Sequence, residues 1–483
     1  MRPKDFSKFF IYRWRFVIGY TLVGILLAVL LLFAGIFVPG GLSESEKIAV
    51  FRSTSLSLTD PTTWTYANLP YLIFQRFSLE LFGISEFTIK LPSLILGLIS
   101  AVGLIVLLRR WFPPSIAVLA SLIAVTTGQF LFVAQNGGAN ILYIFWPVVL
   151  LLLGTQITRG KNLRLLWKIL FAVAAALSLY TPLSIYVLIA VIITVALHPH
   201  LRNVVRRLSK LKIALGLFLA AIIIAPLVYA LTIRPELGLT LLGIPTAEGS
   251  WPPNILANIQ LQLSQFFTFW QPSATSVMTP VFGLGSVLLI GLGLYRLIRT
   301  RETTRSYLVI IWILCLIPIF LLNPLFITVV FVPAVLLLAA GLTSLISYWY
   351  RLFPLNPYAR VAGLVPIIVL VATLILSGVD RYMYGYHYSP NIATSFSRDL
   401  KLLPKEKTTL LVSDAEKNFY TAVSHYRPQL SVTNKQSDVK TETFYSTRDA
   451  RKNVGNTYDI TEIHTSGAAT DADRFYRYQK VSE

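Results

Sequence analysis

The amino-acid sequence predicts an all-α membrane protein with about eleven transmembrane helices and a small C-terminal α/β domain outside the bilayer. Of the 483 residues, 55% are hydrophobic and 13% are charged, about half the charged share of roughly 25% that soluble proteins carry. The apolar residues lie in blocks of 15 to 23 residues, and about 20 apolar residues cross a bilayer as a helix. A soluble enzyme, a fibrous protein and a disordered chain are therefore excluded.

Eleven apolar blocks are the predicted transmembrane spans. Two divisions between them are ambiguous by hydropathy alone, at Pro182 and at Asn323-Pro324. Basic segments flank both regions on each side, and because basic loops stay in the cytoplasm, an even number of crossings lies within each region. Two short helices therefore fit each region. The predicted spans are 16–38, 91–108, 115–133, 139–157, 166–180, 183–197, 213–232, 277–295, 307–322, 325–346 and 361–379.

The net charge of +20 is explained mainly by orientation. With the N-terminus in the cytoplasm, the inner segments hold 22 Lys and Arg residues and the outer loops hold five, in agreement with the positive-inside rule. The excess of basic residues therefore indicates how the chain is oriented in a plasma or inner membrane. Nucleic acid is not an expected partner. The first span, 16–38, is too long for the apolar core of a cleaved signal peptide, so we expect an uncleaved anchor.

The residues outside the membrane are concentrated on the outer side. The outer segments 39–90, 233–276 and 380–483 contain 52, 44 and 104 residues, and long loops usually have a function. We predict a transmembrane domain at 1–379, which includes the first two segments, and a soluble extracytoplasmic α/β domain at 380–483. Within this tail we expect strands at 408–412, 430–433 and 475–481, a helix at 414–425 and a loop at 434–456.

The first outer segment predicts two helices. Ser43 is followed three residues later by Glu46, which is the spacing of a capping box at a helix start. A second helix is expected over 70–82, with Arg76 and Glu80 as an exposed pair four residues apart. This helix is apolar on a broad face, so we expect it to lie in the plane of the membrane interface.

The predicted spans contain few ionisable residues. Lys168, near one end, is the only one inside the limits given above, whereas coupled transporters place such residues in mid-membrane. A transporter or flippase is therefore disfavoured. Cys315 is the single cysteine and is expected to be buried, so no disulfide or Cys-based metal site can form. The outer loops have few clustered acids and no histidine before the tail, so we expect no metal and no cofactor.

Several motifs between about residues 35 and 185 resemble the GT-C superfamily of membrane glycosyltransferases. The most specific is a Phe-Gly at 82–83 followed by Lys90-Leu91-Pro92-Ser93 at the second span. The branch that the sequence resembles contains protein O-mannosyltransferases, aminoarabinose transferases of lipid A and rhizobial lipopolysaccharide galacturonosyltransferases. The other matching motifs are residues 39–43 leading to Glu46, Asn68-Leu69-Pro70-Tyr71, Arg109-Arg110 and Tyr180-Thr181-Pro182.

This resemblance implies a GT-C-like arrangement of helices and a membrane glycosyltransferase. Such an enzyme moves a sugar, with inversion, from a polyprenyl-phosphate-linked donor to an extracytoplasmic acceptor, which is a glycan, a lipid or a protein. An acidic residue of the first outer loop takes the proton of the acceptor hydroxyl. The family has an Asp-Glu pair there, and this sequence has Ser45-Glu46, preceded by Glu44. We expect Glu46 to be the base and Glu44 the alternate, and the capping box is a competing interpretation of Glu46.

The leaving phosphate requires cations or hydrogen-bond donors. Arg52, Lys90 and Arg234 are three of the five basic residues in the outer loops, and we expect them to contact the donor phosphate. The family often has an Arg and an Asp in its second outer turn, where this sequence has the uncharged stretch 134–140. The amide side chains of that stretch are candidate substrate contacts: Gln135, Asn136 and Asn140.

Two other functions remain open from the sequence. The missing charges in 134–140 favour a catalytically degenerate relative, a scaffold that keeps the fold and binds without turnover. A polysaccharide ligase or polymerase also has many spans and a large outer loop. It would use a long glycan on its carrier instead of one sugar.

Overall fold

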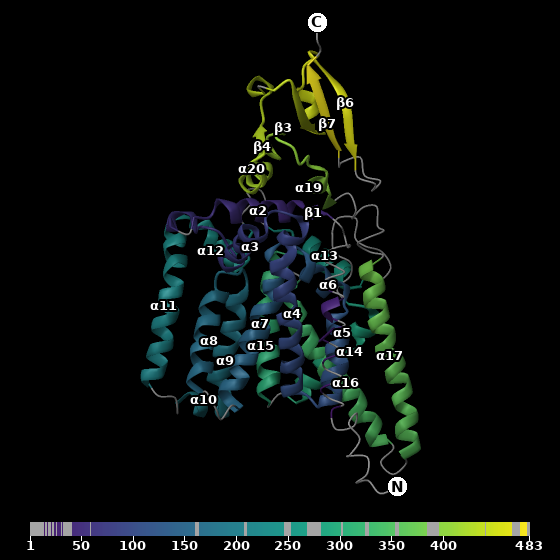
Figure 1. The fold of residues 1–483 in the computed structure, drawn as a ribbon. Helices are drawn as coiled ribbons and strands as arrows, with labels where there is room; N and C mark the ends of the chain where they lie inside the picture. Colours follow the sequence, from purple (N-terminus) through teal and green to yellow (C-terminus); the bar gives the residue numbers. More distant parts are fainter. Residues whose placement is uncertain are drawn as a thin grey trace.

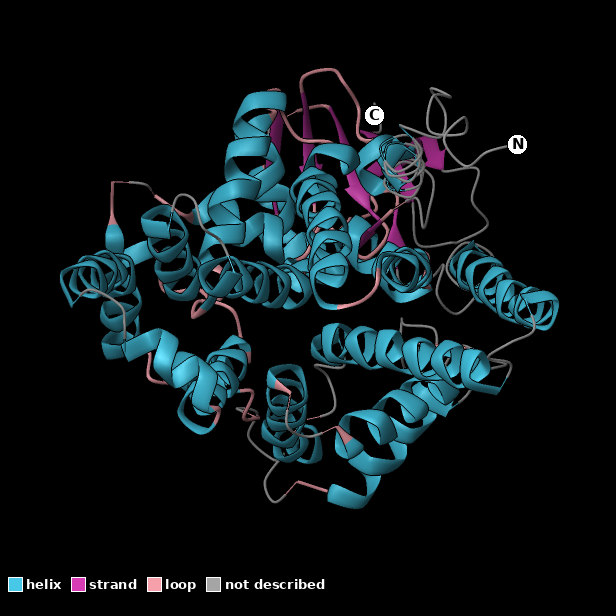
Figure 2. Ribbon diagram, turned by 90° about the horizontal axis from the view of Figure 1, so that it is seen from below, coloured by secondary structure: helices cyan, strands magenta, loops and turns pink. Residues whose placement is uncertain are grey.

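The apolar blocks fold into a bundle of long helices, and the tail forms a sheet beyond one end of that bundle (Figure 1). Figure 2 shows the bundle from below, with many of its helices seen nearly end-on. This computed structural model describes residues 41–57, 59–159, 164–206, 210–245, 253–267, 282–300, 303–323, 328–352, 357–383, 396–439, 441–465 and 474–480, together with single residues between 14 and 31.

The helices follow the predicted blocks closely. In chain order they are α2 (Glu44–Ser55), α3 (Leu69–Phe82), α4 (Glu86–Trp111), α5 (Pro114–Val125), α6 (Gly128–Gln135), α7 (Leu142–Arg159), α8 (Arg164–Ser178), α9 (Ser184–Leu197), α10 (Pro199–Arg206), α11 (Lys210–Ile233), α12 (Glu236–Leu242), α13 (Ile255–Phe267), α14 (Leu284–Arg299), α15 (Thr304–Leu322), α16 (Phe331–Leu352) and α17 (Pro357–Met383). Short 3-10 helices include η3 (Ala139–Ile141).

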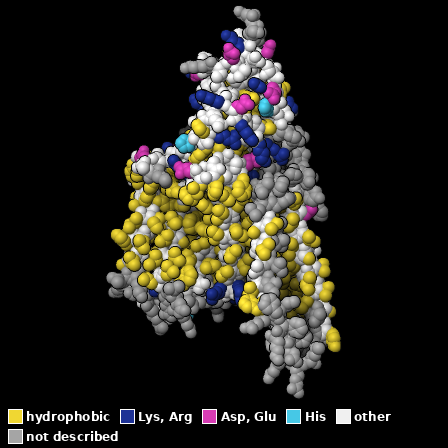
Figure 3. All heavy atoms as spheres, viewed as in Figure 1, with side chains coloured by type: hydrophobic (Ala, Val, Ile, Leu, Met, Phe, Trp, Pro, Cys, Tyr) yellow, Lys and Arg dark blue, Asp and Glu magenta, His cyan; other side chains and the backbone are white. Residues whose placement is uncertain are grey.

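The bundle presents a hydrophobic band to its surroundings (Figure 3). Within the described residues, six helices are long and apolar enough to cross a membrane, and up to eight spans result if each of two bent helix pairs is one span. The chain is therefore a multi-pass membrane protein. The number eleven stays a prediction, because most of 16–38 and part of 277–295 lie outside the described residues.

Two details of the predicted spans are wrong. The span 115–133 is broken, since α5 and α6 meet at an angle of 61°. The break follows from local capping: the Thr127 hydroxyl accepts a hydrogen bond from the Phe130 amide at 3.3 Å and starts a new helix. Cys315, expected to be buried, is only half-buried. It lies on α15, whose neighbouring residues Leu314 and Ile317 also face outward.

The two helices predicted in the first outer segment are confirmed. Ser43 and Glu46 form a capping box at the start of α2. The second helix, α3, ends before Gly83, whose φ of +71° favours glycine. Arg76 Nε and Glu80 Oε1 are 2.6 Å apart. In Figure 1, α2 lies across the upper ends of the long helices, on the side where the tail lies.

The tail contains a five-stranded sheet with the order β4-β3-β5-β7-β6. Its strands β4, β3 and β5 are parallel, and β7 pairs antiparallel with β5 and β6. The predicted loop 434–456 is wrong in part, because β5 lies within it. Phe444 of this strand is fully buried, so one aromatic side chain anchors a strand in a polar segment. The strands are β3 (Thr408–Leu411), β4 (Leu430–Thr433), β5 (Thr443–Thr447), β6 (Tyr458–Thr465) and β7 (Arg474–Lys480), and the helices are α19 (Asp399–Leu402) and α20 (Lys417–Tyr426).

A short strand pair joins the tail to the first outer segment. Strand β1 (Leu42–Ser43) pairs antiparallel with β2 (Phe396–Ser397). A methyl group on Gly41 would lie 2.7 Å from the Ser397 carbonyl oxygen, so the chains approach too closely for a side chain there. Apolar residues of both parts also form one buried cluster, which includes Leu42, Val50, Leu79, Leu400, Phe419 and Val423.

Candidate active site

Glu46 is fully buried and its carboxylate connects two segments. Oε2 accepts hydrogen bonds from the Ser43 amide at 2.7 Å and from the Ser43 hydroxyl at 2.9 Å. Oε1 accepts a hydrogen bond from the amide of Gly137, which lies 91 positions later in the chain. The exposed fraction of Glu46 is 0%. The capping box therefore forms as expected, and the same carboxylate also holds the turn that follows α6.

Lys90 lies in the same buried group. Its side chain, on the first turns of α4, is 1% exposed, and its Nζ donates to Gln135 Oε1 at 3.3 Å. Lys90 interacts electrostatically with the carboxylates of Glu46 and Glu86. A buried ammonium needs such partners, because loss of water disfavours the charged form. Three sequence-predicted residues, Glu46, Lys90 and Gln135, are thus brought together from three separate elements.

The turn between α6 and η3 is held from several sides. Gln75 Nε2 donates to the carbonyl oxygen of Gly137 at 2.9 Å, and the Ser93 hydroxyl donates to that of Gly138 at 3.1 Å. The Asn136 side-chain oxygen accepts from the Gly138 amide at 2.8 Å. A methyl group on Gly137 would lie 2.8 Å from the Ile89 side chain. The turn therefore depends on glycine at this position.

Buried polar atoms remain available near this turn. Among the described residues, Gln135 Nε2 and Gln75 Oε1 are buried without a hydrogen-bond partner. Such atoms are costly unless a ligand or water satisfies them.

The Tyr71 hydroxyl is hydrogen-bonded to Ser93 at 2.8 Å, and burial raises the pKa of Tyr71 well above its usual value. Tyr71 is thus a neutral hydrogen-bonding group at neutral pH.

Two of the predicted phosphate-binding cations meet at an aromatic ring. The guanidinium groups of Arg52 on α2 and Arg234 after α11 each lie 5.7 Å from the centroid of Tyr66. Both arginines are exposed. Cations at this distance from an aromatic face are attracted to it. Tyr66 therefore holds together charges from the outer segments 39–90 and 233–276.

Within the part of the chain that the structure describes, Glu44 and Asn140 form no hydrogen bond or ion pair with Glu46, Lys90 or Gln135. The Glu44 carboxylate is exposed and pairs with Lys47 Nζ at 2.9 Å. That ammonium in turn lies 5.7 Å from the ring centroid of Phe419 on α20. Glu44 thus lies on the side of α2 where Lys47 contacts the tail. Asn140 is half-buried in η3.

Sequence reasoning missed the residues that support the site. Gln75, Ser93 and Tyr66 carry no charge, and their roles depend on contacts with distant segments. The one available signal was the position of Tyr71 and Ser93 inside the motifs quoted above. Among the described residues, no group of three or more His, Cys, Asp or Glu side chains could hold a metal ion.

Comparison with known proteins identifies the fold. Residues 69–229 match the family model of dolichyl-phosphate-mannose-protein mannosyltransferase. The structure is similar to ArnT from Cupriavidus metallidurans bound to undecaprenyl phosphate, with a TM-score of 0.52, 12% identity, and coverage of 96% of this chain and 98% of that one. The chain has the GT-C fold. The predicted resemblance to this superfamily is therefore confirmed.

A second GT-C structure gives the same result. The apo form of the Archaeoglobus fulgidus oligosaccharyltransferase has a TM-score of 0.51 and 14% identity, over 84% of this chain and 64% of that one. The same oligosaccharyltransferase tethered to an acceptor peptide has a TM-score of 0.52 and 12% identity, over 87% and 64%. This chain thus spans less than two thirds of the oligosaccharyltransferase. No curated protein sequence matches the chain.

Proposed function

We propose that this chain is a membrane glycosyltransferase that transfers a sugar from a polyprenyl-phosphate-linked donor to an acceptor outside the cytoplasm. The observation that carries the proposal is the meeting of Glu46, Lys90 and Gln135 below the first outer segment. A carboxylate and an ammonium held together at the outer end of a bundle are the groups that glycosyl transfer needs. The similar ArnT structure contains undecaprenyl phosphate, which supports a donor of this class.

In the proposed reaction Glu46 is the base. The acceptor hydroxyl gives its proton to the carboxylate, the acceptor oxygen forms a bond to the anomeric carbon, and the bond from that carbon to the phosphate oxygen breaks. Attack from the face opposite the phosphate inverts the anomeric centre. The carrier phosphate leaves with the bonding electron pair, and cations stabilise its charge.

The contacts of Glu46 set a condition on this mechanism. Both oxygens already accept hydrogen bonds, and hydrogen bonds to a carboxylate weaken it as a base. Glu46 is also fully buried, so the turn that donates to Oε1 must move before an acceptor hydroxyl can reach this oxygen. Gly137 and Gly138 lie in a turn rather than a helix, so a small shift of this turn opens that oxygen.

The donor is held on the other side by cations and amides. Lys90 supplies a buried charge, and Arg52 and Arg234 supply two exposed charges beside Tyr66. The free Gln135 Nε2 supplies a hydrogen-bond donor. Asn136 and Asn140 complete the proposed contacts with the sugar or its phosphate. The donor thus extends from the exposed arginines toward the buried group.

A second candidate function is binding without turnover. It is favoured by the complete burial of Glu46 and by the ion pair between Glu44 and Lys47. Ser45, which stands where the family has its Asp, is exposed and carries no charge. In this alternative the protein keeps the GT-C fold as a scaffold that holds a lipid-linked sugar.

One experiment separates these functions. The purified full chain is reconstituted in nanodiscs and titrated with a panel of polyprenyl-phosphate sugars, while binding and release of the sugar are measured separately. Release or transfer of the sugar supports the enzyme. Tight binding with no release over hours supports the scaffold, and absence of binding to every donor contradicts both.

A further inference from the structure

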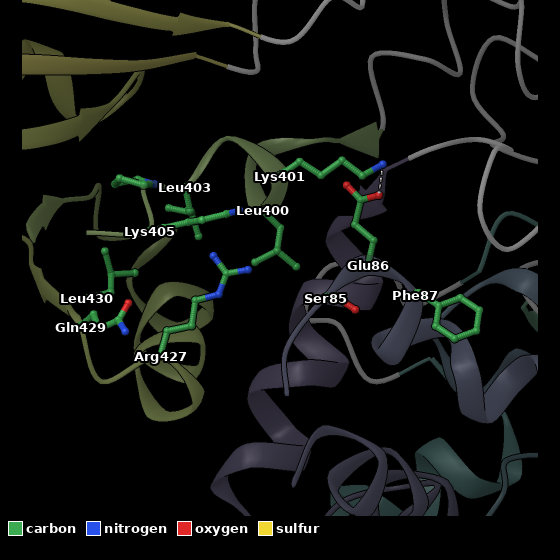
Figure 4. A pocket seen from close by; sticks show the side chains of 11 residues that line it. Ser85, Glu86, Phe87, Leu400, Lys401, Leu403, Lys405, Arg427, Gln429 and Leu430 are labelled. Atoms are coloured by element: carbon green, nitrogen blue, oxygen red, sulfur yellow. Dashed lines mark ion pairs between the residues drawn. The ribbon is translucent and has the colours of Figure 1, made fainter. Parts of the chain in front are cut away.

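A cavity lies where the tail meets the start of α4. Its volume is about 630 Å³, and Figure 4 shows its lining side chains. Residues at the start of α4 form one side, and residues around α19 and after α20 form the other. The lining residues are Ser85, Glu86, Phe87, Leu400, Lys401, Leu403, Pro404, Lys405, Arg427, Gln429 and Leu430. Glu86, an electrostatic partner of Lys90, is among them, whereas Glu46, Lys90 and Gln135 are not, so the cavity adjoins the candidate active site without containing it.

The charges that line this cavity are unbalanced. Lys401 Nζ pairs with Glu86 Oε2 at 2.7 Å. Lys405 and Arg427 have no carboxylate partner among the described residues. Within the described ranges, the hydrogen bond that Arg427 donates is a long one, 3.4 Å, to the Ile84 carbonyl oxygen. Burial lowers the pKa of the Arg427 guanidinium, because the charged form has lost water without gaining a counter-ion. An anion in the cavity would restore that missing interaction.

Glu86 offers a second, different contact. The residue is 8% exposed, and its Oε1 is buried without a hydrogen-bond partner, while Oε2 is taken by Lys401. A buried carboxylate oxygen of this kind can accept a hydrogen bond from a hydroxyl group. Figure 4 shows Glu86 on the α4 side of the cavity, Lys401 extending toward it from α19, and Arg427 on the tail side. A ligand that satisfies both sides must therefore carry an anionic group and hydroxyl groups.

The apolar wall residues and the position of the cavity further restrict the class of ligand that can bind. Leu400, Leu403 and Leu430 are apolar wall residues that suit the carbon face of a sugar ring. Glu86 and Lys90 are four residues apart on α4, which is about 6 Å along a helix axis. The cavity residue Glu86 is therefore about one helical turn from Lys90 of the buried group.

We infer that this cavity binds the acceptor through an anionic saccharide, a sugar that bears a carboxylate or a phosphate. Lys405 and Arg427 hold the anionic group, and Glu86 accepts a hydrogen bond from a hydroxyl. The word acceptor rests on the proposed function, whereas binding of an anionic saccharide does not. An anionic lipid headgroup has the same chemistry, and the experiment distinguishes the two sources.

The test measures binding in the absence of any lipid-linked donor, so it is independent of turnover. The full chain in phosphatidylcholine nanodiscs is titrated with glucose 6-phosphate, glucuronate and glucose. We expect the two anionic sugars to bind and glucose to bind at least tenfold more weakly. Lys405→Gln and Arg427→Gln should each weaken binding of the anionic sugars about tenfold, the scale of one hydrogen bond to a charged group.

Lys407→Gln is the matched control. Lys407 is exposed, lies two residues from Lys405 and does not line the cavity, so this variant should bind as the unmodified chain does. Lys405 is also exposed, which makes Lys405→Gln informative even if Arg427→Gln fails to fold. Equal binding in Lys405→Gln and Lys407→Gln, or equal affinity for glucose and glucose 6-phosphate, overturns the inference.

The last experiment varies the lipid composition of the nanodiscs. In nanodiscs that contain phosphatidylglycerol, the affinity for glucose 6-phosphate should stay within twofold of its value in phosphatidylcholine. The opposite result is that phosphatidylglycerol lowers the affinity for glucose 6-phosphate tenfold or more, and that it has no such effect on Arg427→Gln. A lipid headgroup would then occupy the cavity, and the assignment to the acceptor would be overturned. Failure of donor cleavage in the separate turnover experiment would leave the binding result unchanged.

Discussion

Glu46 accepts a hydrogen bond from the backbone amide of Gly137, and this contact fastens the first outer segment to the turn after α6. The same carboxylate holds the Ser43 amide and hydroxyl through its other oxygen. One side chain thus starts a helix and positions a distant turn. Any catalytic role of Glu46 is therefore combined with a structural one, and experiments on this residue must measure both.

Glu46→Gln should lower both stability and transfer. The glutamine side chain has one carbonyl oxygen, which can accept the hydrogen bonds of either Ser43 or Gly137. Its amide NH2 group then faces the other residue, which is also a hydrogen-bond donor. An unsatisfied buried group of this kind costs about 1–3 kcal/mol, and loss of a positioned base lowers transfer roughly 100-fold or more. The measurements are the thermal unfolding midpoint in detergent and the transfer rate. Glu44→Gln, at an exposed site, should leave stability within about 0.5 kcal/mol. Near-normal transfer in the folded Glu46→Gln variant would move the base role away from Glu46.

Gly137→Ala should destabilise the protein. The added methyl group would lie 2.8 Å from Ile89 Cγ2 and 3.1 Å from Glu46 Oε1, and overpacking of this kind costs about 1–3 kcal/mol. Gly291→Ala on α14 is the control, because a methyl group there meets nothing within 4 Å. The readout is the unfolding midpoint of the two variants. Equal midpoints would show that the turn tolerates a side chain.

Arg52→Gln and Arg234→Gln should each weaken binding of the lipid-linked donor about tenfold, because each removes a charge that we assign to the phosphate. Affinity for the donor in nanodiscs is the measurement. Arg76→Gln is the control, since Arg76 also lies in an outer loop but already pairs with Glu80. Unchanged affinity in the double variant of Arg52 and Arg234 would remove both residues from the donor site.

Cysteine labelling tests the orientation that the basic residues predict. In a Cys315→Ser background, Asn203→Cys on α10 and Ala415→Cys in the tail are both exposed positions. An impermeant thiol reagent added to intact cells should label Ala415→Cys and should not label Asn203→Cys. Permeabilised cells, in which both positions react, provide the control. Labelling of Asn203→Cys in intact cells contradicts the predicted topology.

Much of the fold could be predicted because it depends on local patterns. The capping box of Ser43 and Glu46 follows from a spacing of three residues, and the long helices follow from apolar blocks. The break between α5 and α6 escaped prediction because the short polar stretch Thr126–Gln129 lies between two apolar runs that together have the length of one span. Strand β5 escaped because its polar neighbours hide one buried aromatic side chain, Phe444.

The contacts of the site depend on segments far apart in sequence. Lys90 and Gln135 are 45 positions apart, and Tyr66 gathers two arginines from different outer segments. Residue type identified the charged members of these groups. Only the fold shows that Glu46 and Lys90 share one buried environment while Glu44 pairs with Lys47.

The pairing of β1 with β2 gives the tail a mechanical connection to the candidate site. Ser43 belongs to this strand pair, and its amide and hydroxyl also hold the Glu46 carboxylate. A force that draws Phe396 and Ser397 away from the membrane therefore pulls on the residue that orients Glu46. A ligand that displaces this strand pair therefore changes the position of the Glu46 carboxylate without touching Glu46 itself.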